Sequence, residues 1–236
     1  MEMRSKQTVL ITGGNRGIGL ELSRGFLALG YQLIVIARDF ECFEFRDHAQ
    51  VTEVPFDLCH VDQIPALIAS LPPIDVLMNN AGVMYSYAYD EYPREKSHAM
   101  LKLNLEAPVQ LIESVSKQML EHGGGRIVNN ASVAAFTGHP DIWYGITKAG
   151  LINATKSFAK IFSGKIIINA VAASPVDTDM QKVNTEARKQ AFKNSTISQR
   201  FATAEEVAKT MIWLATESPE YINGTCIDIN NGSYPR

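Results

Sequence analysis

The chain has 236 residues, 46% of them hydrophobic, and this length suits one globular α/β domain spanning residues 1–236. A formal net charge of −3 and the lack of any apolar run near 18 residues argue against nucleic acid and membrane as partners. Three widely spaced cysteines, Cys42, Cys59 and Cys226, form no C-x-x-C pair and predict reduced thiols in a cytoplasmic protein without a metal site.

A strand followed by a glycine-rich turn opens the chain. Residues 9–12 are apolar or β-branched, as in a buried strand, and glycines follow at positions 13, 14, 17 and 19. Apolar residues then recur at helical spacing from Leu20 to Leu29. Such a turn brings backbone N–H groups close to a phosphate, and the helix N-terminus adds partial positive charge. The Gly-x3-Gly-x-Gly spacing differs from G-x-G-x-x-G and lacks the Gly-Lys-Ser/Thr of an ATP-binding loop, which predicts a dinucleotide bound in a variant way.

The rest of the chain alternates predicted strands with predicted helices. Further buried strands are expected at residues 32–37, 51–56, 74–79, 126–131, 166–171 and 226–229. Helices are expected as a short stub within 40–50, at 61–70, 94–121 and 143–162, and in parts of the polar stretch 179–200. Thr203 and Glu206 form a capping box for a last helix ending near Ala215. This alternation predicts a doubly wound parallel sheet of about seven strands with helices on both faces.

Polar residues gather where the predicted strands end. In open parallel sheets, ligands bind beyond the carboxyl ends of the strands. Those ends carry Gly13, Arg38, Asp57, Asn80 and Ser132. The informative polar side chains are therefore expected along one edge of the sheet.

Two residues at the start of the second long helix suit proton transfer. Tyr144 and Lys148 are four residues apart, so they share one face of the helix. A nearby positive charge favours the phenolate and lowers the tyrosine pKa, so the phenol can give or take a proton near neutral pH. Ser132 ends the preceding strand, and Asn104 lies inside the preceding helix, where asparagine is a poor helix former.

Five motifs stand in order along the chain: Thr12-Gly13-x3-Gly17-x-Gly19, Asn79-Asn80-Ala81-Gly82, Asn104, Ser132 and Tyr144-x3-Lys148. Together they resemble the short-chain dehydrogenase/reductase family over essentially the whole chain. The tail, residues 223–232, is similar to that of bacterial 3-oxoacyl-(acyl-carrier-protein) reductases of this family. The resemblance implies a Rossmann fold, a nicotinamide cofactor, and hydride transfer to a carbonyl or from an alcohol.

The resemblance also implies residue roles. Tyr144 would be the general acid/base, Ser132 would hold the substrate oxygen, Lys148 would lower the Tyr144 pKa and bind the nicotinamide ribose, and Asn104 would hold a water in the proton relay. The expected cofactor-binding residues are Gly13, Asn15, Arg16, Gly17, Ile18, Gly19, Arg38, Asp57, Leu58, Asn80, Ala81, Gly82, Tyr144, Lys148, Val176 and Thr178. Family members usually carry Pro-Gly where this chain has Ala173-Ser174.

The residues after the second strand favour NADP(H). An acidic residue there would bind the ribose 2′-hydroxyl of NAD, whereas arginine suits a 2′-phosphate. This chain has Ala37 at the usual acidic position and Arg38 next, with Arg16 in the glycine turn. Two guanidinium groups can make charge-assisted bonds to one phosphate. Asp39 follows Arg38, and we interpret it as a solvated loop residue or a partner for Arg38.

Three functions remain open. The leading prediction is an NADP(H)-dependent reductase of a small-molecule carbonyl, with a 3-oxoacyl thioester as one candidate. The alternatives are an NAD(P)-dependent sugar or alcohol dehydrogenase and a catalytically silent NADP-binding sensor. Substrate contacts are expected from residues 83–92, 134–143 and 179–200. Within them, residues 139–141 either line the substrate entrance or form an ordinary surface loop.

The two long helices predict a homo-oligomer. Apolar residues in 94–121 and 143–162 cover more than one stripe, and a helix that is apolar on most sides must be buried on most sides. Pairing of these helices across a two-fold axis would bury the apolar residues that do not pack on the sheet. The resemblance implies the same arrangement doubled into a tetramer, with a dimer as the alternative.

Overall fold

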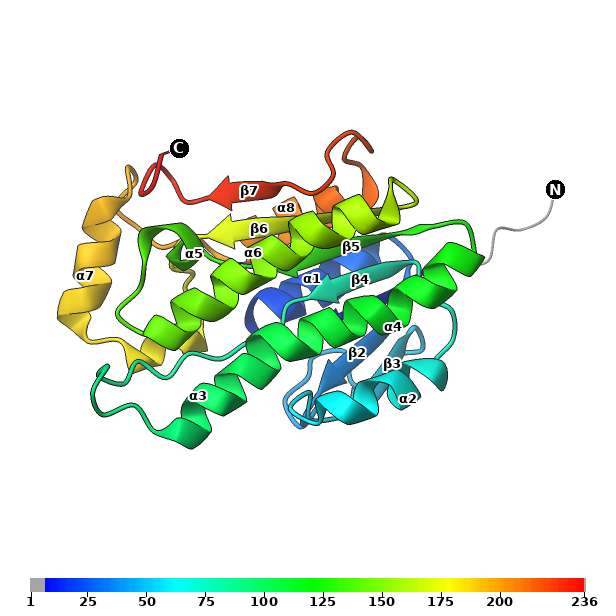
Figure 1. Cartoon of the computed structure of the whole chain (residues 1–236), viewed down its shortest axis with the longest axis horizontal. Coiled ribbons are helices and arrows are strands. Elements are labelled where there is room, and N and C mark those ends of the chain that lie inside the picture. The colour runs from blue at the N-terminus through cyan, green and yellow to red at the C-terminus, as the bar shows by residue number, and fades with distance from the viewer. Residues whose placement is uncertain (1–6, 236) are drawn as a thin grey trace.

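The computed structural model describes residues 7–235, and these contain a seven-stranded parallel sheet (Figure 1). The strands are β1 (Thr8–Thr12), β2 (Gln32–Ala37), β3 (Val51–Pro55), β4 (Val76–Asn79), β5 (Gly125–Asn130), β6 (Ile166–Ala173) and β7 (Cys226–Ile229). Their spatial order is β3-β2-β1-β4-β5-β6-β7. The chain runs outward from β1 to β3 on one side and from β4 to β7 on the other, so the strand order reverses between β1 and β4. The predicted doubly wound parallel sheet is confirmed.

Helices cover both faces of the sheet. On one face, α1 (Gly17–Ala28) packs beside α8 (Ala204–Thr216). On the other face lie α2 (Ile64–Ala69), α4 (Ala107–Glu121) and α6 (Ile142–Phe162), with the last two side by side (Figure 1). Alternate strand residues point to opposite faces, so Val9 and Ile11 enter one apolar core and Leu10 enters the other. Because both faces are buried, the strands are continuous apolar runs.

The last helix follows its capping prediction. Thr203 Oγ1 accepts a hydrogen bond from the Glu206 N–H at 3.1 Å, and Glu206 Oε2 accepts one from the Thr203 N–H at 2.8 Å. This reciprocal pair is the capping box that the sequence predicts at the start of α8.

The predicted stub of helix within residues 40–50 is wrong. This stretch forms successive turns, in which the Phe43 N–H donates to the Phe40 carbonyl and the Arg46 N–H donates to the Phe43 carbonyl. Phe40 and Phe43 are buried with their ring centroids 5.7 Å apart. Aromatic burial, rather than helical periodicity, therefore fixes the path of this segment.

The predicted helix at 94–121 is divided into three parts. They are α3 (Arg94–Leu101), a π-helical turn (Lys102–Glu106) and α4. Pro108 has no N–H, so it cannot donate to the Asn104 carbonyl as a regular α-helix would require. The wider π-turn, which lies directly before α4, accommodates this missing hydrogen bond.

The remaining helices are short and lie near the carboxyl ends of the strands. They are α5 (Ala134–Thr137), which the sequence did not predict, and α7 (Glu186–Ser195). Two 3₁₀ turns, Val61–Gln63 and Asp179–Val183, precede α2 and α7. Figure 1 shows α7 at the end of the sheet toward which the strand arrows point. In the described chain, no helix combines the length and the hydropathy needed to span a bilayer.

Candidate active site

A cavity of about 780 Å³ opens at the carboxyl ends of the strands, where the strand order reverses. It gathers most of the residues that the sequence proposed for cofactor and chemistry. Those in its wall are Gly13, Asn15, Arg16, Gly17, Ile18, Arg38, Asp57, Leu58, Asn80, Ala81, Gly82, Ser132, Tyr144, Lys148, Val176 and Thr178. Two predicted site residues, Gly19 and Asn104, do not line the cavity themselves.

The N-terminus of α1 borders the cavity without a side-chain cap. Arg16 is the N-cap residue, and its side chain makes no capping hydrogen bond. Gly13 and Gly17 have φ values of +63° and +53°, a left-handed conformation that glycine adopts without strain. The first-turn N–H groups of α1 therefore remain available to an anion beside the glycine turn.

Gly19 allows close packing at the start of α1. A Cβ at this position would lie 1.9 Å from the Gly13 carbonyl oxygen and 2.8 Å from Asn80 Nδ2. Asn80 Nδ2 itself donates to the Thr12 carbonyl at 3.1 Å. Glycine at 19 thus lets α1 sit directly on the turn that Asn80 holds in place.

Arg38 and Asp57 lie together in the wall beyond β2 and β3. The Cys59 backbone N–H donates to Asp57 Oδ1 at 2.9 Å and lowers the Asp57 pKa, and the Arg38 guanidinium lowers it further. Asp39 is exposed, and its backbone carbonyl accepts from Asn15 Nδ2 at 3.0 Å. Asn15 therefore ties the end of β2 to the glycine turn, next to the cation at Arg38.

Ser132, Tyr144 and Lys148 meet inside the cavity. Ser132 follows β5, its Oγ accepts the Ala134 N–H at 3.2 Å and lies 3.5 Å from the Ala173 carbonyl oxygen, and its hydroxyl is close enough to the Tyr144 phenol to lower the Tyr144 pKa. Lys148 lies one turn further along α6, with Nζ 5.7 Å from the centroid of the Tyr144 ring. Lys148 Nζ donates to the Asn130 carbonyl at 2.6 Å. All three side chains are buried, so their polar groups face one another in a water-poor site.

The electrostatic balance at Tyr144 differs from the expectation of a lowered pKa. Burial raises the Tyr144 pKa, the hydrogen bond with Ser132 lowers it, and the negative charge of Asp141 raises it. Burial also lowers the pKa of Lys148 to about 8. Desolvation is the largest cause of both shifts, and the Lys148 ammonium donates to the Asn130 carbonyl. Tyr144 is consequently a protonated phenol at neutral pH.

Asn104 fixes the chain that follows β4. Its Oδ1 accepts the Val83 N–H at 2.8 Å, and its Nδ2 donates to the Val83 carbonyl at 2.8 Å. Nδ2 also lies 3.4 Å from Thr147 Oγ1. Asn104 is buried, and a Cβ on Gly82 would lie 3.4 Å from its Oδ1. The side-chain amide is therefore committed to holding the chain at Val83 in place.

The Ala173-Ser174 pair, which stands where family members usually have Pro-Gly, lies at the end of β6. The strand runs to Ala173, two residues beyond its predicted end. Ala173 and Ser174 carry backbone N–H groups, and the Ser174 N–H donates to the Ile229 carbonyl at 2.9 Å. Val176 and Thr178 follow and still line the cavity.

The far wall of the cavity is largely apolar and includes the expected substrate segments. Its apolar members are Val83, Met84, Ala134, Met180, Val183 and Phe192. His139 lines the cavity with its ring centroid 5.2 Å from that of Tyr144, and Nη2 of Arg188, on α7, donates to its Nε2 at 2.9 Å. Burial, followed by the Arg188 charge, lowers the His139 pKa. The imidazole is therefore neutral.

Asp141 is more deeply embedded in the site than the sequence predicts. For residues 139–141 the sequence allows either a lining of the substrate entrance or a surface loop, whereas Asp141 is completely buried and caps α6. The available signal was its position three residues before Tyr144, typical of an N-cap aspartate.

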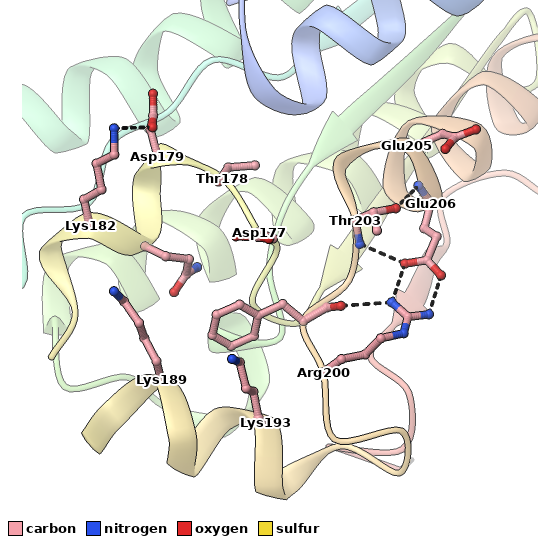
Figure 2. A pocket seen from close by; sticks show the side chains of 12 residues that line it. Asp177, Thr178, Asp179, Lys182, Lys189, Lys193, Arg200, Thr203, Glu205 and Glu206 are labelled. Atoms are coloured by element: carbon pink, nitrogen blue, oxygen red, sulfur yellow. Dashed lines mark hydrogen bonds and ion pairs between the residues drawn. The ribbon is translucent and has the colours of Figure 1, made fainter. Parts of the chain in front are cut away.

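A second hollow of about 960 Å³ lies behind the segment 177–181, which borders both cavities. Figure 2 shows its charged lining, with Lys182 paired to Asp179 and Arg200 paired to Glu206. Lys189 and Lys193 reach it from α7. Because acids and bases alternate around it, this hollow has no single-sign field for an ionic ligand. Within residues 7–235, no group of three or more His, Cys, Asp or Glu side chains is placed to hold a metal.

Comparisons with known proteins bear on this arrangement. The short chain dehydrogenase family model matches residues 7–189. The 3-oxoacyl-[acyl-carrier-protein] reductase FabG of Aquifex aeolicus is 31% identical, over 99% of this chain and all of its own length. The chain belongs to the short-chain dehydrogenase family. This membership makes it an oxidoreductase acting on CH–OH or C=O groups.

Solved structures of the short-chain dehydrogenase fold are closely similar. The structure of ElxO with NADP bound is 29% identical, with a TM-score of 0.87 over 97% of this chain and 99% of ElxO. A gluconate 5-dehydrogenase from Burkholderia cenocepacia, in complex with NADP and tartrate, is 27% identical, with a TM-score of 0.88 over 98% of this chain and 96% of its own. The predicted Rossmann fold is confirmed.

Proposed function

We propose that this protein is an NADPH-dependent reductase that delivers hydride to a carbonyl carbon, with a 3-oxoacyl thioester as its substrate. The observation that carries the proposal is the Ser132–Tyr144 pair, buried in one cavity with the glycine turn. The 3-oxoacyl reductases named among its relatives support the substrate class.

The residues of the cavity fit an NADP cofactor. The uncapped N-terminus of α1 suits the pyrophosphate, and Arg38 suits a 2′-phosphate. Asp57 would bond the adenine edge, and Val176 and Thr178 would contact the nicotinamide amide; all three line the cavity. When bound, the cofactor supplies the hydride. The NADP-bound structures of ElxO and the gluconate 5-dehydrogenase support this assignment.

The chain's own groups would handle the substrate oxygen and the proton. Ser132 would donate a hydrogen bond to the carbonyl oxygen, and Tyr144 would give it a proton as hydride arrives. Lys148 would bind the nicotinamide ribose and supply positive charge to the phenolate left on Tyr144. The Asn104 carbonyl would hold the water that returns a proton from solvent. Because burial keeps the Tyr144 phenol protonated, the site suits reduction, in which tyrosine is the acid.

The apolar far wall favours an acyl chain over a sugar. Met84, Met180, Val183 and Phe192 offer surface to alkyl groups and few partners to hydroxyls. The likeness to a gluconate 5-dehydrogenase favours the runner-up, a sugar or alcohol dehydrogenase. The silent sensor, the third alternative, would not need the buried proton donor and lysine described above.

The decisive assay follows NADPH absorbance with acetoacetyl thioesters of coenzyme A and of acyl carrier protein, simple ketones and 5-ketogluconate. We expect thioester turnover to exceed the others. Preferred turnover of 5-ketogluconate would establish the runner-up. Tight NADPH binding without turnover of any substrate would establish the sensor.

We also propose a single-domain chain, residues 1–236, in the cytoplasm, where Cys42, Cys59 and Cys226 stay reduced; none of the three forms a disulfide within residues 7–235.

The chain is expected to form a homotetramer through α4 and α6, with a dimer as the alternative. Ile142, Ile146 and Ile161 on α6 are 48%, 47% and 68% exposed. Exposed apolar side chains on a long helix are typical of a helix–helix interface. Light scattering at micromolar concentration should give an oligomeric mass, and Ile146→Glu should lower it. Leu29→Glu, at the end of α1, is the matched control. A monomeric mass for the unmodified chain would contradict this interface.

A further inference from the structure

Asp141 accepts four hydrogen bonds while completely buried, between two segments of the cavity wall. Its Oδ1 accepts the Tyr144 N–H at 3.2 Å. Its Oδ2 accepts the Tyr85 N–H at 3.2 Å, the Ser86 N–H at 2.8 Å and the Tyr92 hydroxyl at 3.1 Å. All four partners are donors, which suits the two oxygens of a carboxylate.

The donors come from the first turn of α6 and from the substrate loop, residues 83–92, which joins β4 to α3. An N-cap needs only the bond to Tyr144, which Ser, Thr or Asn would also accept. The other three bonds hold the substrate loop, whose Val83, Met84 and Tyr85 line the cavity. One carboxylate thus links the catalytic tyrosine's helix to a wall of the substrate site.

The substrate loop needs such a support because the backbone conformation of Ser86 and the burial of its hydroxyl are both unfavourable. Its φ is +60°, in the left-handed region that a residue with a side chain rarely adopts. Its hydroxyl is buried without a hydrogen-bond partner. Strain of this kind persists only where the surroundings fix the backbone, and the 2.8 Å bond to Asp141 is such a contact.

We propose that Asp141 is a positioning residue, which sets the substrate loop against Tyr144 so that the carbonyl meets the phenol and the Ser132 hydroxyl. The inference rests on the proposed function and extends it to a residue outside the reacting groups. The Asp141 charge also acts on Tyr144 through space, because it raises the Tyr144 pKa. Other ionisable groups near this cluster are Arg188, the neutral His139, Lys148 beside the Tyr144 ring, Lys96 over the Tyr85 ring and the Tyr92 phenol, which stays protonated because its pKa is raised.

Asp141→Asn tests the proposal with little change in shape. The amide oxygen can still cap α6, but its NH₂ group then faces the donors of the substrate loop. We expect kcat/KM for the carbonyl substrate to fall roughly ten- to a hundredfold, as small misplacements of reacting groups do. The NADPH Kd should stay within about twofold, because none of the four bonds belongs to the glycine turn. Asp62→Asn, an exposed aspartate that lines neither cavity, is the control for loss of charge.

Two readouts separate positioning from a purely structural role. Removing the Asp141 charge should lower the Tyr144 pKa, so the alkaline limb of the kcat/KM profile should move to lower pH. Amide exchange at Tyr85 and Ser86 should become faster in Asp141→Asn. If folded Asp141→Asn shows unchanged kcat/KM and unchanged amide exchange at Tyr85 and Ser86, the proposal is overturned, whether or not its Tm is lower.

The exchange measurement needs no turnover, so it remains informative if the proposed function fails. That failure would appear separately, as activity retained by Tyr144→Phe. If Asp141→Asn does not fold, Tyr92→Phe removes one bond to Asp141 and should reduce kcat/KM roughly two- to tenfold. Unchanged kcat/KM and loop exchange in Tyr92→Phe would then overturn the proposal.

Discussion

Tyr144→Phe should lower kcat by at least about a hundredfold, the low end of what general acid–base catalysis contributes. The substitution removes the phenol O–H and leaves a ring of nearly the same volume in a buried site. NADPH affinity should be nearly unchanged, because the glycine turn and Arg38 are untouched. The rate is measured as NADPH oxidation at saturating substrate, and the affinity by fluorescence titration.

The matched control is Tyr221→Phe, which removes the same hydroxyl from a fully exposed tyrosine. Its kcat should equal that of the unmodified protein. Most of the activity surviving in Tyr144→Phe would show that the proton comes from another group.

Arg38→Ala should weaken NADPH binding roughly ten- to a hundredfold while leaving NADH binding nearly unchanged. A charge-assisted hydrogen bond is worth about 1.5–3 kcal/mol, and only NADPH carries the 2′-phosphate that would make it. Arg38 lines the cavity close enough to Asp57 to lower its pKa. Titration of both cofactors with one preparation gives the ratio directly.

Arg46→Ala serves as the control, since it removes the same charge from an exposed residue outside the cavity wall. Equal losses for NADPH and NADH in Arg38→Ala would mean that Arg38 does not distinguish the two cofactors.

The sheet was predictable because local rules determine it. Continuous apolar runs mark buried strands, and the glycines after residue 12 mark the first turn. The meeting of Ser132 with Tyr144 follows from a strand end and a helix start in neighbouring βα units. Lys148 follows Tyr144 by one helical turn. Each of these placements could be predicted because the regular geometry of strands and helices fixes where such residues lie relative to one another.

What the sequence did not reveal depends on contacts between distant segments. Asp141 contacts residues 85–92, about fifty positions earlier in the chain, and no periodicity encodes that pairing. The turns at 40–50 are fixed by packing of Phe40 and Phe43 under the sheet edge rather than by a helical face. The Tyr144 pKa is raised chiefly by burial, and Lys148, which the spacing made prominent, is not among the groups that shift it.

The position of β3 at the outer end of the sheet bears on aggregation. An edge strand exposes unpaired backbone groups that can recruit a strand from another molecule. Here β3 is five residues long, carries the charge of Glu53 and ends at Pro55, which has no N–H to offer. Proline and charge both discourage strand addition. In a crowded cell, these features therefore disfavour association of another strand with this edge of the sheet.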